Sequence, residues 1–444
     1  MSKGKRLLAL LLAVILAVSL LALPASAAGT SSKNKYPVVL VHGLLGWGSY
    51  DEINNIVPYW GMSTGSITNY LALRGYKTYA ASVGPLSSAW DRACELYAQI
   101  TGTRVDYGAA HSAKYGHDRY GVDYGQYNKL IPNYTWSAAN KINLVGHSFG
   151  GATIRLFEDI LADGSAEEKA ATRDGTLSPF FQGGKGNWVY SITTLAAPSN
   201  GTTFIEANED FTAVAAELAT DMAKALGVTK YKGVYDFDLN QFGIYKNNNE
   251  TMLEALDRVL KSDFLSHNDN AFEDLTIDKA MSINQNIQMQ KGVYYFSYYG
   301  CRTYVTPLGN SLPNFRMWVP LKVFATKMGA YTGWTAGQFP DGYGSALQTV
   351  SVTPTYCSKS WQPSDGMVNV VSGRWPYHLV NGKVAADAHT AYPYSGTLKA
   401  GVWYVMPQQP LDHVSFAGSF FNEGVVSTHA LYMEIMSNIT RVKG

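Results

Sequence analysis

The sequence contains a glycine-flanked serine, Ser148, in the pentapeptide Gly146-His-Ser-Phe-Gly. The apolar run at residues 142–145 predicts a buried strand before it, and residues 152–161 predict a helix after it. A nucleophilic serine on a sharp strand-to-helix turn needs small flanking residues, because its backbone is strained and its neighbours are crowded. The pattern therefore predicts Ser148 as a nucleophile.

A second motif, His42-Gly-Leu44, follows a β-branched run at residues 36–41. In α/β-hydrolases a loop after an early strand offers one backbone N–H group to the oxyanion, and the residue after the serine offers the other. Leu44 and Phe149 occupy these positions. We expect His42 to brace this loop as a structural residue.

A serine nucleophile of this kind needs a general base and an orienting acid, in the chain order Ser, Asp or Glu, His. His413 lies near the end of the chain, and Asp365 lies in the turn signal Ser-Asp-Gly. Asp412 adjoins His413, but adjacent side chains point apart. Spacing favours Asp365 and His413 without excluding the other downstream histidines, which are His267, His378, His389 and His429.

Strands that alternate with helices must position these residues, and this alternation predicts an α/β sheet. The expected strands are residues 36–41, 142–145, 188–195 and 293–298, and the expected helices are residues 66–73, 89–100 and 152–161. Continuous apolar strands suit the buried middle of a parallel sheet. Nothing resembles a linker, so we expect one domain with large insertions over residues 28–444.

Residues 204–226 predict an amphipathic helix, because apolar side chains recur at intervals of three and four residues. These apolar residues are Phe211, Val214, Leu218, Met222 and Leu226. Periodicity alone leaves open an ordinary core-packing helix. The polar stretch that follows, residues 230–280, predicts only short helical patches.

A possible metal site starts from His111 and His117, six residues apart in a loop of small residues, with Asp91 before them. Two neutral imidazoles and carboxylates suit a tetrahedral zinc ion. The spacing by itself is weak, and two exposed loop histidines are the simpler interpretation.

Charge and the first residues bear on location. The 444 residues contain 35 Lys and Arg against 34 Asp and Glu, so there is no electrostatic footprint for nucleic acid. A basic head, an uncharged run from Leu7 to Leu23 and the end Ala25-Ser-Ala27 predict a cleaved secretory signal at residues 1–27. The alternative is an uncleaved membrane anchor. After cleavage we expect a secreted protein without a stable membrane span.

Three cysteines are too few for a disulfide framework. Either Cys301 pairs with Cys357, or these two and Cys94 are all buried apolar residues.

Several longer blocks of sequence resemble one family, the zinc-containing secreted lipases of Gram-positive bacteria (staphylococcal and thermoalkalophilic bacillus-type enzymes). The most specific block is Trp90-Asp-Arg-Ala-Cys-Glu95, and the resemblance extends over essentially the whole chain after the signal. Further blocks are 84–88, 105–111, 177–179, 193–198, 201–203, 234–237 and 364–366. The resemblance implies an α/β-hydrolase fold.

Position by position, the resemblance implies Ser148 as nucleophile, His413 as general base and Asp365 as its orienting acid. It implies a structural zinc ion on Asp91, His111, His117 and a later aspartate, which matches Asp269, with His267 as a nearby competitor. The zinc would anchor an insertion at about residues 85–125. The helix in residues 204–226 would be a lid, within a helical region of about residues 204–280.

The sequence also departs from the family. Gly146 and Phe149 stand where the family often has Ala and Gln. The positions that correspond to the family's calcium ligands are Ser415 and Phe420-Phe421. Because calcium needs oxygen ligands and phenylalanine offers only a carbonyl, we expect no family-type calcium site.

The expected activity is ester hydrolysis through an acyl-enzyme, with triacylglycerol at an oil–water interface as the first candidate substrate. A carboxylesterase or polyester hydrolase on the same scaffold is the first alternative. The second is an exported binding protein on an inactive hydrolase scaffold.

Overall fold

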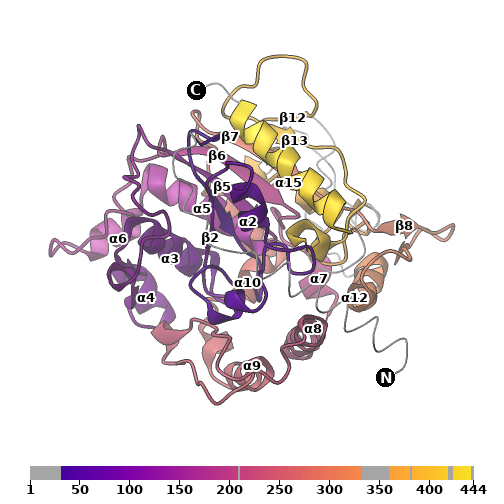
Figure 1. The fold of residues 1–444 in the computed structure, drawn as a ribbon, viewed down its shortest axis with the longest axis horizontal. Helices are drawn as coiled ribbons and strands as arrows, with labels where there is room; N and C mark the ends of the chain where they lie inside the picture. The colour runs from indigo at the N-terminus through magenta and orange to yellow at the C-terminus, as the bar shows by residue number, and fades with distance from the viewer. Residues whose placement is uncertain (1–31, 209–210, 333–359, 381–382, 419–423, 442–444) are drawn as a thin grey trace.

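A seven-stranded parallel sheet forms the centre of the computed structural model, which describes residues 32–208, 211–332, 360–380, 383–418 and 424–441 (Figure 1). Its strand order is β12-β13-β7-β6-β5-β1-β2, and all neighbouring strands run parallel. The strands are β1 (Val38–Val41), β2 (Thr78–Ala81), β5 (Ile142–His147), β6 (Val189–Leu195), β7 (Tyr294–Tyr298), β12 (His389–Ala391) and β13 (Trp403–Val405).

Both faces of the sheet are buried. Val38 and Leu40 of β1 belong to one apolar cluster, and Val39 and Val41 belong to the other. Successive side chains of a strand point to opposite faces, so each cluster fills one side. One side holds α3 (Ala89–Thr101) and α5 (Phe149–Asp163), which pack on each other, and the opposite side holds α2 (Ile67–Ala72) and α15 (Gly424–Arg441).

The four strands expected from sequence are β1, β5, β6 and β7, and the three expected helices are α2, α3 and α5. Strong end signals explain this agreement: for α3, the Ser88 hydroxyl accepts the N–H of Asp91, and Gly102 ends the helix with φ 69°. The α/β fold is confirmed. Strands β2, β12 and β13 went unpredicted. β12 and β13 have only three residues each, and β2 (Thr-Tyr-Ala-Ala) lacks the run of β-branched apolar residues that marks β1.

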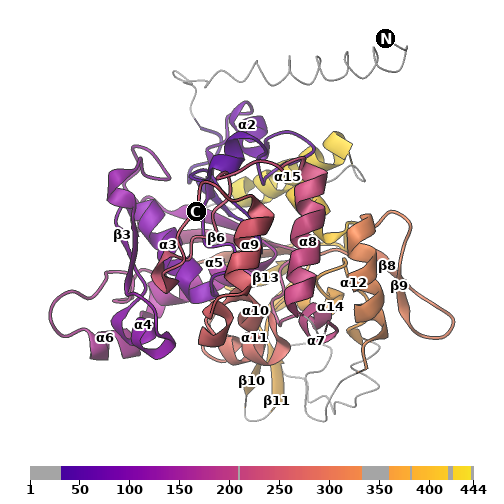
Figure 2. The same cartoon turned by 90° about the horizontal axis from the view of Figure 1, so that it is seen from below.

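The expected 204–226 helix is divided. α7 (Thr203–Glu206) ends before α8 (Phe211–Leu226), so the amphipathic pattern belongs to α8 alone. Val214, Leu218 and Met222 are buried. α8 lies beside α9 (Met252–Leu260) in Figure 2, and α10 (Ala271–Leu275) and α11 (Ile277–Asn284) complete this helical region.

The remaining helices and strands lie in the segments that connect the elements described above. They are β3 (Arg104–Asp106), α4 (Ala109–Tyr115), β4 (Tyr120–Asp123), α6 (Ala166–Ala171), β8 (Thr303–Val305), β9 (Ser311–Pro313), α12 (Val319–Ala330), α14 (Val370–Arg374), β10 (Tyr377–Val380), β11 (Lys383–Ala386), and the 3-10 helices η1 (Glu52–Asn55), η2 (Tyr124–Gln126), η3 (Asn240–Phe242), η4 (Phe264–His267) and η5 (His413–Ala417).

Three predictions fall outside the described residues: the signal at 1–27, the pairing partner Cys357 and the pair Phe420-Phe421. Cys94 is buried and Cys301 is half-buried. In the described part of the chain, no helix combines the length and apolar character needed to cross a membrane.

Candidate functional site

Ser148 sits on a strained turn between β5 and α5, with φ 55° and ψ −131°. The two flanking glycines are required by close backbone contacts. A Cβ added at Gly146 would lie 2.4 Å from the carbonyl oxygen of Gly150, and one added at Gly150 would lie 2.2 Å from that of Val41. The G-x-S-x-G pattern is thus explained by a turn pressed against strand β1.

This crowding predicts a stability defect. We expect Gly150→Ala to lower the free energy of unfolding by about 1–3 kcal/mol, because the new methyl group meets backbone that cannot move aside. Urea unfolding measures the change. Gly292→Ala is the matched control, since nothing lies within 4 Å of a Cβ added there. Equal stability of the two variants would contradict the crowding argument.

A continuous chain of hydrogen bonds links Ser148, His413 and Asp365, all three of which are buried. The Ser148 hydroxyl lies 2.8 Å from His413 Nε2, and His413 Nδ1 lies 3.0 Å from Asp365 Oδ2. The other oxygen, Asp365 Oδ1, accepts the backbone N–H groups of Met367 and Val368. The carboxylate is therefore fixed by the backbone of its own turn and can orient the imidazole.

Asp412, next to His413, has a different position. One of its oxygens accepts the N–H of Ser415 at the start of η5, and the other accepts the N–H of Trp318 at 2.7 Å. The four other downstream histidines contact groups away from Ser148: the Tyr115 carbonyl for His267, Asp387 for His378 and His389, and the Tyr70 ring for His429.

The loop after β1 lies directly against the serine, since a Cβ added at Gly43 would stand 3.0 Å from Ser148 Oγ. His42 braces this loop: its Nε2 accepts the N–H of Val83 at 3.2 Å, and its Nδ1 donates to the Gly43 carbonyl at 2.9 Å. Burial, and then the charge of Arg92, lowers the pKa of His42 well below its usual value. A neutral, fixed imidazole agrees with the structural role expected for it.

Tyr59 and His147 form a link that sequence reasoning missed. The Gly43 N–H donates to the Tyr59 hydroxyl at 3.1 Å, and that hydroxyl lies 2.6 Å from His147 Nδ1. His147 Nε2 donates to the His413 carbonyl at 2.9 Å, because a carbonyl can only accept. Burial, with the nearby His413, lowers the pKa of His147 well below its usual value, so Nδ1 accepts from Tyr59. The link ties the Gly43 loop to the backbone of His413.

A separate cluster joins Asp91, His111, His117 and Asp269, with one potential ligand atom from each lying within 4.8 Å of the others. Asp269 Oδ2 lies 3.0 Å from His111 Nε2 and 3.2 Å from His117 Nε2. His117 Nδ1 donates to the Asp118 carbonyl, which turns the lone pair of Nε2 toward the cluster.

The donor set fits a metal ion. His117 Nε2 is buried and accepts no hydrogen bond among the described residues, so its lone pair faces the Asp269 carboxylate without a proton between them. Asp91 Oδ1 is also buried and forms an ion pair with His111 Nε2 at 3.3 Å. Burial, and then the charge of Asp269, raises the pKa of Asp91. Two imidazoles and two carboxylates without a cation between them are costly to bury. The structure therefore contains a possible metal-binding cluster, and His267 lies outside it.

The expected absence of a family-type calcium site stays a prediction. Ser415 stands at one of the corresponding positions, and its hydroxyl and N–H both bond to Asp412 Oδ1. The other two positions, Phe420 and Phe421, lie outside the described residues.

The parallel sheet, the strained serine turn after β5 and the serine–histidine–aspartate chain together define an α/β-hydrolase. A family model described as the C-terminal domain of lipase-like proteins matches residues 34–338, and the chain belongs to this family. The resemblance seen in the sequence is therefore confirmed.

Three relatives illustrate the similarity. A lipase of Staphylococcus epidermidis is 36% identical over 394 residues, which are 87% of this chain and 50% of the relative. The crystal structure of Staphylococcus hyicus lipase has a TM-score of 0.74 at 30% identity, covering 94% of this chain and 98% of that one. EstA from Clostridium botulinum has a TM-score of 0.78 at 32% identity, covering 94% and 90%. The chain spans about half the length of the curated relatives it matches.

Proposed function

We propose that this protein is a secreted serine ester hydrolase that acts on triacylglycerols. The observation that carries this proposal is the buried hydrogen-bond chain from Ser148 through His413 to Asp365. Two of the relatives, those from Staphylococcus epidermidis and Staphylococcus hyicus, are named lipases, and these names support the class of reaction.

In the proposed reaction the Ser148 oxygen attacks the ester carbonyl while His413 Nε2 accepts its proton. Collapse of the tetrahedral intermediate breaks the bond to the alcohol, and His413 returns the proton to the leaving oxygen. Water then attacks the acyl-enzyme in the same way and regenerates Ser148. Asp365 holds the imidazole in the tautomer with hydrogen on Nδ1 and stabilises its charged form.

The oxyanion would be held by the backbone N–H groups of Leu44 and Phe149. Neither group donates a hydrogen bond within the described residues, so both remain available. Phe149 opens α5, and its N–H is one of those that a helix leaves unpaired at its start.

We propose zinc as the metal held by Asp91, His111, His117 and Asp269. Two nitrogen and two oxygen ligands suit a closed tetrahedral site, which stabilises a fold and leaves no position for substrate. Asp91 lies on α3, His111 lies on α4, His117 follows the end of α4, and Asp269 precedes α10. A bound ion would fasten an insertion at about residues 85–125 to the 204–280 region, within a single domain spanning residues 28–444.

We further propose export through the signal at residues 1–27 and a lid formed by α8. The burial of Val214, Leu218 and Met222 and of Ser148 itself supports a covered site. A long apolar cover suits substrates that gather at an oil–water interface. A carboxylesterase or polyester hydrolase with the same residues is the alternative, and a binding protein without activity is disfavoured by the intact hydrogen-bond chain.

Initial rates on p-nitrophenyl butyrate and on emulsified long-chain triacylglycerol test the substrate class. We expect activity on both substrates, and we expect the rate to rise when the substrate concentration exceeds its solubility limit. Activity on the soluble ester alone would favour the esterase or polyester alternative. Absence of turnover on either substrate would favour the binding protein.

The Tyr59–His147 link gives a further prediction. We expect Tyr59→Phe to lower kcat about tenfold with little change in KM, because the Gly43 loop and His413 lose their connection while the substrate pocket keeps its shape. Steady-state kinetics on p-nitrophenyl butyrate measure the two constants. Tyr432→Phe is the control, since this tyrosine is also buried but its hydroxyl donates to a carbonyl, that of Phe416, rather than to a histidine ring. Equal kcat in both variants would rule out a positioning role for Tyr59.

A further inference from the structure

The hairpin of β8 and β9, together with α12, carries an exposed apolar surface that we call the hairpin surface. Its large side chains and their exposed fractions are Tyr304 (53%), Val305 (63%), Leu308 (92%), Phe315 (84%), Val319 (71%) and Val323 (48%). The hairpin projects beyond α12 at the edge of the molecule in both Figure 1 and Figure 2. Grouped exposed apolar side chains of this kind mark interaction sites.

The charges in this segment all have one sign. Residues 293–332 contain four cationic residues and no Asp or Glu. Arg302 is buried, whereas Arg316 is exposed just before α12, and Lys322 and Lys327 lie along this helix. The apolar side chains are therefore bordered by positive charge within their own segment.

The opposite face of α12 packs against the candidate active site. Leu321 lies under the turn of Asp365, because a Cβ added at Gly366 would be 3.0 Å from Leu321 Cβ. The N–H of Trp318 bonds to Asp412, the neighbour of His413. A partner bound to the hairpin surface would thus lie beside the loops that hold Asp365 and His413, the proposed acid and base.

Phe324 extends the same buried face of α12 toward the helical region, where its ring meets that of Phe204 edge-on at 5.1 Å. Phe204 belongs to α7, the short helix that precedes α8. The hairpin surface is therefore connected by direct packing to the segment that leads into the proposed lid.

We propose that the hairpin surface docks the enzyme on anionic lipid surfaces. Apolar side chains would enter the boundary between head groups and acyl chains, and the neighbouring cations would pair with anionic head groups. A hairpin tip whose Leu308 is almost fully exposed suits insertion into such a layer. This inference rests on the proposed function, and it adds a lipid charge preference and a site of attachment that are distinct from the triad and from α8.

Flotation with phosphatidylcholine vesicles, with and without phosphatidylglycerol, tests the proposal, with all proteins carrying Ser148→Ala to prevent hydrolysis. We expect binding to the anionic vesicles that weakens in high salt. Leu308→Ser with Phe315→Ser, and separately Arg316→Glu with Lys322→Glu, should each reduce it about tenfold or more.

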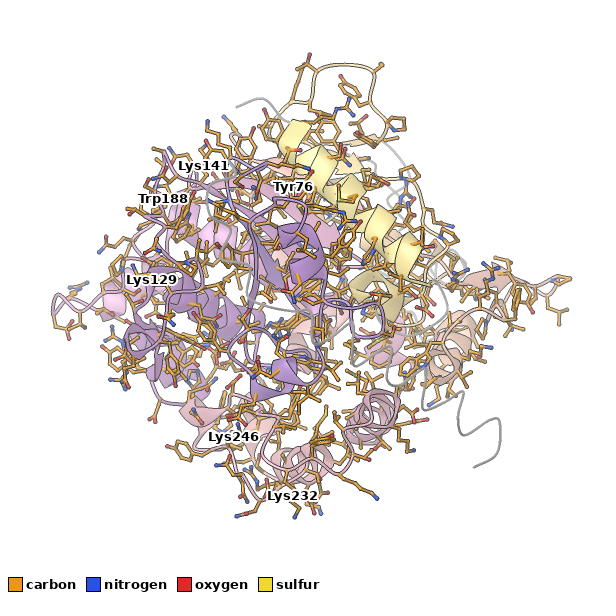
Figure 3. All side chains as sticks on the ribbon, in the orientation of Figure 1. Tyr76, Lys129, Lys141, Trp188, Lys232 and Lys246 are labelled. Atoms are coloured by element: carbon orange, nitrogen blue, oxygen red, sulfur yellow. The ribbon has the colours of Figure 1, made fainter. Side chains whose placement is uncertain are left out.

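Matched controls lie elsewhere on the molecule. Leu73→Ser removes a side chain that is 79% exposed on α2's end, and Lys129→Glu reverses a charge far from the hairpin in the view of Figure 3. Both should bind vesicles as the parent does. The same substitutions in the Ser148 protein should leave turnover of p-nitrophenyl butyrate unchanged, which shows that the variants are folded.

Vesicle binding that is absent in the parent, or equal in all variants, would overturn the proposal even if the soluble ester is hydrolysed. Self-association that the hairpin variants abolish in the absence of lipid would instead identify a second copy of the chain as the occupant, and would also overturn it. Absence of esterase activity in the Ser148 protein, with lipid binding intact in the Ser148→Ala parent, would refute the proposed function alone.

Discussion

Ser148→Ala is expected to lower kcat for p-nitrophenyl butyrate by about 10⁵–10⁶-fold without unfolding the protein. The hydroxyl is the only group that Ser148 offers to His413 Nε2, at 2.8 Å, and alanine can neither attack the ester nor return a proton. Steady-state rates and an unfolding curve of the same preparation measure both quantities. Near-full activity in the variant would refute Ser148 as the nucleophile.

The residues of the hydrogen-bond chain should act as one unit. We expect His413→Ala to cost about as much as Ser148→Ala, and the double variant to cost little more than either. Asp365→Asn should lower kcat by about 10⁴-fold, because the amide disturbs the imidazole tautomer. Ser297→Ala is the matched control: this serine of β7 is also buried, and its hydroxyl has no partner among the described residues. Losses that multiply in the double variant would argue against a shared mechanism.

Removal of the metal is expected to destabilise the fold. A ligand at 1,000 times its Kd stabilises a fold by about 4 kcal/mol. The entropy of unfolding is about 2.1 cal/mol/K for each residue near 60 °C, so in a domain of about 400 residues this free energy corresponds to a Tm shift of about 5 °C. We therefore expect a chelator to lower Tm by on the order of 5 °C, and zinc to restore it. Elemental analysis should find one zinc ion for each chain.

Two histidines provide a matched pair for the metal prediction. His117→Ala removes a group whose Nε2 faces Asp269, whereas His267→Ala removes one whose Nδ1 bonds to the Tyr115 carbonyl. Zinc content and its effect on Tm should be lost in the first variant and kept in the second. The reverse result would place His267, rather than His117, among the metal ligands. If neither the chelator nor added zinc changes the Tm, the proposal of a structural metal would be refuted.

Elements with a strong local signal could be predicted from the amino-acid sequence alone. The buried strands β1, β5, β6 and β7 were readable because continuous apolar runs suit the middle of a parallel sheet. The serine turn was readable because its crowding demands glycine at both flanks, as the contacts of Gly146 and Gly150 demonstrate. The family could be recognised from specific blocks, and the resemblance supplied the candidate metal ligands, which spacing alone left weak.

Contacts in the folded protein separate candidates that the sequence offers for the same role. Asp365 rather than Asp412 reaches His413, because Asp412 is turned to the N–H groups of Ser415 and Trp318. Asp269 rather than His267 joins the possible metal-binding cluster. Which candidate faces a site depends on backbone direction, and contacts from distant segments determine that direction.

The structure also revealed features that leave no mark in local pattern. Tyr59 and His147 are 88 residues apart in the sequence, so no local motif could have predicted their hydrogen bond. The sequence prediction placed one helix at residues 204–226, whereas α7 ends at Glu206 and the amphipathic pattern begins with α8 at Phe211. The hairpin surface could be recognised only from the exposure of its side chains in the structure, because residue type alone does not tell whether an apolar side chain is buried or exposed. Periodicity in the sequence indicates which residues share a face of a helix or strand, whereas the tertiary packing determines whether that face contacts the core or the solvent.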